Sequence, residues 1–124
     1  MNFKIITIDN KNEWDNTVKS FADYEVYYLS GYAYGFKVHG DGEPVLLYFE
    51  DKDRKLRAMN VVMKREIADI GDFKNPKAVA GLYDAATPYG YGGLVAEGNI
   101  TEEFCKEYSY FCAANNIVSE FVRF

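Results

Sequence analysis

The pattern of apolar and polar residues divides the chain into segments with strand-like or helix-like character. Segment 3–8 is apolar and β-branched and ends at a polar cluster, which is typical of a strand. Apolar residues then recur at helical spacing, so we predict a helix over 11–21. Asn10 followed by Glu13 resembles a capping box at the start of this helix.

Segment 23–38 is rich in tyrosine and glycine. Tyr28 and Tyr32 are four positions apart, as are Gly31 and Gly35, and this spacing predicts a second helix. Each glycine costs a helix ~1 kcal/mol relative to alanine. We therefore interpret the two glycines as a flat strip against which another part of the chain packs, with a functional use of the strip as the alternative.

Two apolar segments next predict an antiparallel hairpin. The glycines and proline of 39–44 indicate a turn, 45–50 is a strand, and 55–67 is a longer strand after a short polar connection. In the longer strand, one face carries Met59, Val61 and Met63, and the other carries Ala58, Asn60 and Val62.

Segment 68–86 shows no clear period, and we predict a loop with one short element. A helix is predicted over 101–116, where Thr101 can cap the first turn. Its buried stripe is formed by Phe104, Tyr108, Phe111 and Cys112. Asn115 or Asn116 can adopt the left-handed conformation that ends such a helix.

Segment 117–124 is predicted to be a last strand. One face carries Ile117, Ser119, Phe121 and Arg123, and the other carries Val118, Glu120, Val122 and Phe124. No turn or polar tail follows it, so we expect the natural fold to continue past this strand. The fold class expected for 1–124 is a single α/β (α+β) domain with a mixed, mainly antiparallel sheet flanked by helices.

Composition and charge narrow the function classes. The net charge of −5 and the pI near 4.9 argue against general binding to nucleic acid. No apolar run approaches the ~20 residues of a membrane span, and no signal peptide is recognisable, so we expect a cytoplasmic protein. Cys105 and Cys112 would lie ~10 Å apart on one helix, too far for a disulfide. With the single His39 they form no zinc-ligand pattern, so no metal site is predicted.

The segment "ATPYGYGGLV" (86–95) is the most distinctive motif. It is not a dinucleotide-binding fingerprint, because the third glycine position falls on Val95, and no lysine completes a P-loop. One interpretation is an irregular turn made by Pro88 and the glycines. The other is a ligand-binding loop, in which Tyr89 and Tyr91 flank backbone N–H groups left accessible by glycine.

The order of the segments resembles the N-terminal half of FemAB-like proteins, which are GNAT-type acyltransferases. The resemblance covers nearly the whole chain. It is carried by "TPYGYGG" (87–93) and "IVSEFVRF" (117–124), supported by "VYYLSGY" (26–32) and "PVLLYFE" (44–50). It implies a protein of two GNAT-like halves that moves an acetyl group from acetyl-CoA, or an amino acid from aminoacyl-tRNA, onto an amine. In the cell-wall branch the acceptor is a peptidoglycan precursor.

The resemblance implies an acceptor-side domain whose partner is a small-molecule or peptidyl amine acceptor. The implied substrate-binding residues are Tyr89, Gly90, Tyr91, Gly92, Gly93 and Arg123. The acyl-CoA loop of GNAT enzymes, Q/R-x-x-G-x-G/A before a helix, does not occur in the sequence. We therefore expect no catalysis and no cofactor binding by this chain alone, with acetyl-CoA or aminoacyl-tRNA as the donor of a complete enzyme. The alternative is a non-enzymatic ligand-binding domain, or one that forms a homodimer through its last strand.

The sequence leaves two interpretations open for several charged residues. Arg123 either pairs with an acid such as Glu120 at the surface or binds an anionic group of the acceptor, and Arg65 either joins it or ends a solvated strand. Asp84 is the best carboxylate for a base or an amine-orienting group, although a turn-forming aspartate is the commoner case. His39 is expected in an exposed turn, and the catalytic residues stay unidentified.

Overall fold

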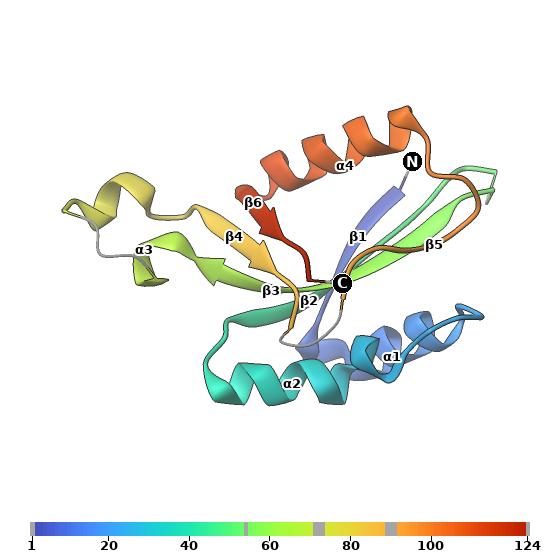
Figure 1. The fold of residues 1–124 in the computed structure, drawn as a ribbon, viewed down its shortest axis with the longest axis horizontal. Helices are drawn as coiled ribbons and strands as arrows, with labels where there is room; N and C mark the ends of the chain where they lie inside the picture. The colour runs from blue at the N-terminus through green and yellow to red at the C-terminus, as the bar shows by residue number, and fades with distance from the viewer. Residues whose placement is uncertain (1, 54, 71–73, 89–91, 124) are drawn as a thin grey trace.

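The computed structural model describes residues 2–53, 55–70, 74–88 and 92–123. Helices cover both faces of one six-stranded sheet (Figure 1). The strands are β1 (Asn2–Thr7), β2 (Glu43–Glu50), β3 (Arg57–Glu66), β4 (Tyr83–Ala86), β5 (Val95–Glu97) and β6 (Ile117–Phe121). The α-helices are α1 (Lys11–Lys19), α2 (Ser30–His39), α3 (Ile67–Ile70) and α4 (Glu102–Ala114), with 3-10 turns at Ile8–Asn10, Val26–Tyr28 and Pro76–Val79. The predicted fold class is confirmed.

The sheet has the order β1-β2-β3-β4-β6, and β5 pairs with β3 beside this path. All pairs are antiparallel except β4 and β6, which run parallel. β4 pairs with 63–66 of β3 and β5 pairs with 57–59, both on the edge that faces away from β2. Among the described residues, no strand pairs with 60–62 on this edge, which lies between the end of β4 and the start of β5.

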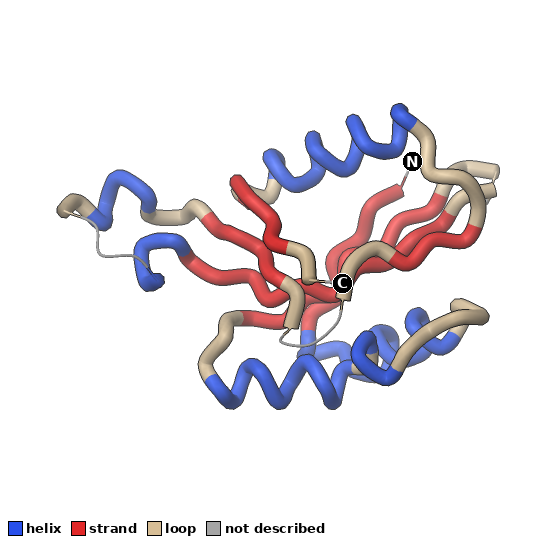
Figure 2. Tube along the Cα trace, viewed as in Figure 1, coloured by secondary structure: helices blue, strands red, loops and turns tan. Residues whose placement is uncertain are grey.

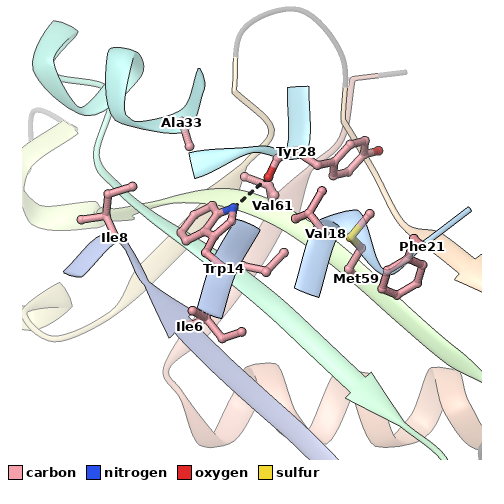
Figure 3. Packing of buried hydrophobic residues seen from close by; sticks show 10 residues of the cluster. Ile6, Ile8, Trp14, Val18, Phe21, Tyr28, Ala33, Met59 and Val61 are labelled. Carbon is pink, nitrogen blue, oxygen red and sulfur yellow. Dashed lines mark hydrogen bonds between the residues drawn. The ribbon is translucent and has the colours of Figure 1, made fainter. Parts of the chain in front are cut away.

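One core lies between the sheet and the helices α1 and α2 (Figure 3). Met59 and Val61 of β3 face this core, as predicted from their spacing. Trp14 is fully buried, and its indole N–H donates to the Tyr28 carbonyl oxygen at 2.8 Å. Asp15 on the same helix accepts hydrogen bonds from the backbone N–H and the hydroxyl of Ser30, so α1 caps the start of α2.

The second face of the sheet packs under α4, which Figure 2 shows as the helix opposite α1 and α2. Phe49 and Phe104 bring their ring centroids to 4.2 Å, and Ala58 and Val62 of β3 lie in this layer. Both faces of β3 are thus buried, which explains why its alternation of apolar and polar residues is imperfect.

Several details of the two N-terminal helices differ from prediction. The Asn10 side chain does not cap α1 but donates to the Glu13 carboxylate at 2.6 Å. The predicted second helix begins only at Ser30, after a 3-10 turn. A Cβ atom added to Gly31 or Gly35 would meet no atom within 4 Å. The packing explanation for these glycines is therefore wrong, because both face open space.

The C-terminal third was predicted in part. Thr101 caps α4 by accepting the Phe104 N–H at 3.1 Å, and Asn116 has the expected left-handed φ of 60°. The region 68–86 contains more than the one short element predicted, because it holds the end of α3, the 3-10 turn Pro76–Val79 and the strand β4. Strand β6 ends at Phe121, and its pairing with β4 shifts register between Tyr83 and Asp84. This shift breaks the predicted alternation of faces.

No helix in the ranges described is long and apolar enough to cross a membrane. Both cysteines are free thiols; Cys105 is exposed and Cys112 is half-buried. His39 is exposed, as predicted, and contacts Asp41 at 3.1 Å.

Candidate ligand-binding site

The parallel strands β4 and β6 end side by side, and Thr87 joins their ends. The Thr87 N–H donates to the Phe121 carbonyl oxygen at 3.0 Å, and its hydroxyl oxygen accepts the Arg123 N–H at 3.1 Å. Thr87 is only 9% exposed. A side-chain oxygen thus replaces a backbone acceptor just where the strand pair ends, and it fixes the backbone at Arg123.

The segment 86–95, here called the Tyr–Gly motif, reaches this junction at Gly92. The Gly92 N–H donates to the Arg123 carbonyl oxygen at 3.0 Å. A Cβ atom at Gly92 would lie 2.6 Å from the Thr87 methyl carbon, so the close approach of the two segments requires glycine. The Gly93 carbonyl oxygen accepts the buried Tyr28 hydroxyl at 3.1 Å. Tyr89, Gly90 and Tyr91 lie outside the described residues.

A hollow of about 240 Å³ opens beside the junction, on the face of the sheet that carries α1 and α2. Its lining includes Asp41, Arg65, Thr87, Pro88, Phe121 and Arg123. The Arg123 guanidinium lies over the Phe121 ring, 5.6 Å from its centroid. The lining therefore combines two guanidinium groups and one carboxylate with an aromatic ring.

Arg65 is held in place by Asp84 on the neighbouring strand. Its Nε donates to Oδ1 of Asp84 at 2.8 Å and its Nη2 donates to Oδ2 at 2.6 Å, a bidentate pair. These hydrogen bonds raise the pKa of Arg65 above its ordinary value, so the group stays charged. The prediction that Asp84 forms a turn is wrong, because it lies in β4 opposite Arg65.

A second hollow of about 560 Å³ adjoins the first and shares Asp41 and Arg65 with it. Lys37, Lys64, Glu66 and Tyr83 also line it, and the Lys64 ammonium lies 4.1 Å from the centroid of the Tyr83 ring. Charged groups of both signs therefore continue from the smaller hollow along the end of β3. A ligand longer than the smaller hollow can extend in this direction.

The structure brings together some of the predicted site residues and adds others. Gly92 and Arg123 meet at the junction, and Arg65 lines the same hollow as Arg123. Gly93 instead accepts the Tyr28 hydroxyl, and neither glycine is among the described residues that line the hollow. Asp41 and Thr87 are additions. Thr87 directly precedes Pro88, and a residue before proline is restricted to extended backbone, which says nothing of what its side chain contacts. Asp41 stood in a predicted turn, where aspartate is common. No signal in the sequence placed either residue near Arg123.

Arg123 and Glu120, which the sequence offered as a surface pair, lie on opposite faces of the sheet. The Glu120 carboxylate turns to the opposite face of the sheet, where it accepts hydrogen bonds from Asn60 at 2.7 Å and Tyr108 at 2.9 Å. Arg123 lines the hollow on the α2 face. The pairing of Arg123 with Glu120 is therefore wrong, and the anion-binding interpretation of Arg123 stays a prediction.

Comparison of the chain with models of protein families, with curated proteins and with solved structures finds no match. The functional argument therefore rests on the residues themselves. Within the described ranges, no group of three or more histidine, cysteine, aspartate or glutamate residues is placed to hold a metal ion.

Proposed function

We propose that this chain is the acceptor-binding domain of a FemAB-like, GNAT-type transferase, which moves an acyl or aminoacyl group onto an amine. The observation that carries the proposal is the hollow beside the Thr87 junction, where Arg65, Arg123 and Asp41 lie around one small space. Segments 87–93 and 117–124 carry the resemblance to these transferases, and Thr87 and Gly92 of the first segment contact Arg123 of the second.

The lining favours an acceptor that bears both an amine and an anionic group. Arginine binds carboxylate or phosphate through two parallel N–H donors, and both Arg65 and Arg123 line the hollow. Arg123 is the proposed anion-binding group because Thr87 fixes its backbone directly beside this space. Asp41 supplies a carboxylate that can accept hydrogen bonds from an ammonium group. An acceptor fixed at both ends would present its amine in one orientation, which accelerates attack on the donor.

The reaction in this proposal is direct attack of the acceptor amine on the thioester of acetyl-CoA or the ester of aminoacyl-tRNA. The amine nitrogen forms the new amide bond, the thiol or tRNA hydroxyl leaves, and the proton of the amine passes to solvent or a base. A backbone N–H near the reacting carbonyl would stabilise the developing oxyanion. The donor binds to residues outside this chain, and both donors place the protein in the cytoplasm.

Acceptor binding can be tested with glycylglycine, which carries an ammonium and a carboxylate at opposite ends. We expect saturable changes in the amide NMR signals of Thr87, Gly92 and Arg123. N-acetylglycylglycine lacks the ammonium and glycylglycine amide lacks the carboxylate, so each should bind about tenfold more weakly if one charge contact contributes ~1.4 kcal/mol. Equal shifts with all three compounds would show that the hollow does not recognise either charge.

The matched variants are Arg123→Gln and Lys74→Gln. Arg123→Gln removes the proposed anion-binding group and is expected to weaken glycylglycine binding about tenfold. Lys74 is exposed and lies outside both hollows, so its variant should bind like the unchanged protein. If Arg123→Gln binds glycylglycine as tightly as the unchanged protein, Arg123 is not the anion-binding group.

A second candidate function is homodimerisation through β6, because β6 is the last strand in the sheet order. Val118 and Phe121 on this strand are 57% and 59% exposed. An edge strand with exposed apolar side chains can pair with a second copy. Sedimentation velocity would then show a dimer that Val118→Lys disrupts. Val38→Lys, at a 71% exposed site on α2, is the control and should leave the dimer intact; a monomer at all concentrations would refute this candidate.

A further inference from the structure

A cluster of three polar side chains lies on the α4 face of the sheet, apart from the acceptor hollow. Asn60 donates its amide N–H to Oε1 of Glu120 at 2.7 Å, and the Tyr108 hydroxyl donates to Oε2 at 2.9 Å. Asn60 also approaches the Tyr108 hydroxyl oxygen at 3.3 Å. These contacts connect β3, α4 and β6, which are far apart in the sequence.

The cluster borders a hollow of about 230 Å³ between α4 and β6. Its lining includes Tyr108, Cys112, Ile117, Val118, Ser119 and Glu120. Glu120 is the only charged side chain among the described residues that line it. Because both hydrogen-bond donors on its carboxylate are neutral groups, its negative charge is offset only by dipoles.

The cluster holds more acceptors than donors. Asn60 is 2% exposed, and its carbonyl Oδ1 is buried with no hydrogen-bond partner among the described residues. Asn60 does not itself line the hollow, so the surplus acceptors of the cluster that a ligand meets there are the oxygens of Glu120. Each oxygen of the Glu120 carboxylate can also accept more than one hydrogen bond. A ligand that brings N–H donors and a positive charge matches this surplus, whereas an anion or a pure acceptor would worsen it.

The negative charge also affects its neighbours. Burial, followed by the charge of Glu120, raises the pKa values of the Tyr108 hydroxyl and the Cys112 thiol above their ordinary ranges. Both groups therefore stay protonated at neutral pH. Among the described residues that line the hollow, the negative charge therefore lies on Glu120.

We infer that this hollow binds a small organic cation, a primary alkylammonium, with its charge on the Glu120 carboxylate. The ammonium group has three N–H donors and no acceptor, which suits the surplus of acceptors in the cluster. Ile117 and Val118 offer apolar surface to the alkyl chain. A divalent metal ion fits less well, because it requires several oxygen ligands and the hollow offers one carboxylate.

The test uses n-butylammonium chloride, with sodium chloride replacing it to hold the ionic strength constant. We expect saturable changes in the amide NMR signals of Ser109, Cys112 and Ser119, and little change at Thr87 and Gly92. Butan-1-ol has the same chain without the charge and should bind about tenfold more weakly. Equal binding of the two compounds, or no saturable change at this hollow, would overturn the inference.

The matched variants are Glu120→Gln and Glu103→Gln. Glu120→Gln removes the charge and keeps one of the two oxygen acceptors, and it is expected to weaken n-butylammonium binding about tenfold. Glu103 is exposed on α4 outside the hollow, and its variant should bind normally. Binding to folded Glu120→Gln at the original affinity would refute the assignment. If that variant does not fold, the comparison with butan-1-ol still decides the question, and neither result depends on the acceptor hollow.

Discussion

At the scale of single residues, Thr87 connects the site to the sheet. Its backbone N–H and its hydroxyl oxygen bind the two ends of the short segment from Phe121 to Arg123. Its methyl group fills the space that a side chain at Gly92 would need. The backbone that carries Arg123 is therefore positioned by one small side chain rather than by a continued strand ladder.

Replacing Thr87 tests this role. Thr87→Val keeps the shape but removes the acceptor of the Arg123 N–H, and we expect a loss of ~1–3 kcal/mol in the free energy of unfolding. Thr87→Ser keeps the oxygen and should lose less. Urea denaturation followed by circular dichroism measures both values. If the valine variant is as stable as the serine variant, the hydroxyl does not hold this junction.

The residue scale also shows what the sequence could predict about the site. The sequence drew attention to Gly92 and Arg123 because glycine and arginine have distinctive properties, and the structure places Gly92 at the junction and Arg123 in the lining of the hollow. Their role in binding a substrate stays a prediction. The importance of Thr87 and Asp41 depends on which distant segment lies beside them. That information comes from the parallel pairing of β4 with β6, and no local pattern contains it.

At the scale of secondary structure, the long elements were predicted from the sequence pattern, whereas the short strands were not. The hairpin of β2 and β3 has long apolar runs, and α4 has apolar residues at helical spacing. β4 has four residues and β5 has three, too few to show a period. Both form because β3 offers them a free edge, so tertiary pairing rather than local preference creates them.

The exposed glycines of α2 give a prediction for this element. Gly35 lies within the helix, and an added Cβ would contact nothing within 4 Å. Gly35→Ala should therefore raise the free energy of unfolding by ~0.5–1 kcal/mol, because alanine favours the helix and has room. Gly92→Ala is the contrasting variant, with an expected loss of ~1–3 kcal/mol from overpacking. Thermal denaturation would compare them; a destabilised Gly35→Ala would mean that this face is covered in the folded protein.

At the scale of the whole molecule, the partly buried tyrosines link stability to alkaline pH. Burial raises the pKa values of Tyr28, Tyr32, Tyr48 and Tyr108, with the charge of neighbouring acids adding to the effect at Tyr28, Tyr48 and Tyr108. Unfolded tyrosine loses its proton near pH ~10, whereas these folded side chains still hold theirs. The unfolded state then binds fewer protons, so stability is full below this pH and falls as the pH rises above it.

Tyr108 should contribute strongly to this fall, because it is deeply placed beside Glu120. Tyr108→Phe removes the ionisable group, and we expect its free energy of unfolding to decrease less steeply with pH above ~10. Its stability at neutral pH should be lower by ~1 kcal/mol for the lost hydrogen bond, so the slope is the informative quantity. Urea denaturation at a series of alkaline pH values measures this slope. Identical slopes in the unchanged protein and in Tyr108→Phe would contradict the expectation.

The central claim is that the hollow beside the Thr87 junction holds the amine acceptor of an acyl transfer. The most direct measurement is transfer by the complete product of the gene, with acetyl-CoA and aminoacyl-tRNA each supplied as donor and glycylglycine as acceptor. We expect amide formation with one donor, and a KM for glycylglycine about tenfold higher in Arg123→Gln with the KM for the donor unchanged. No transfer with either donor to any amine bearing an anionic group, or transfer unaffected by the substitution, would contradict the account.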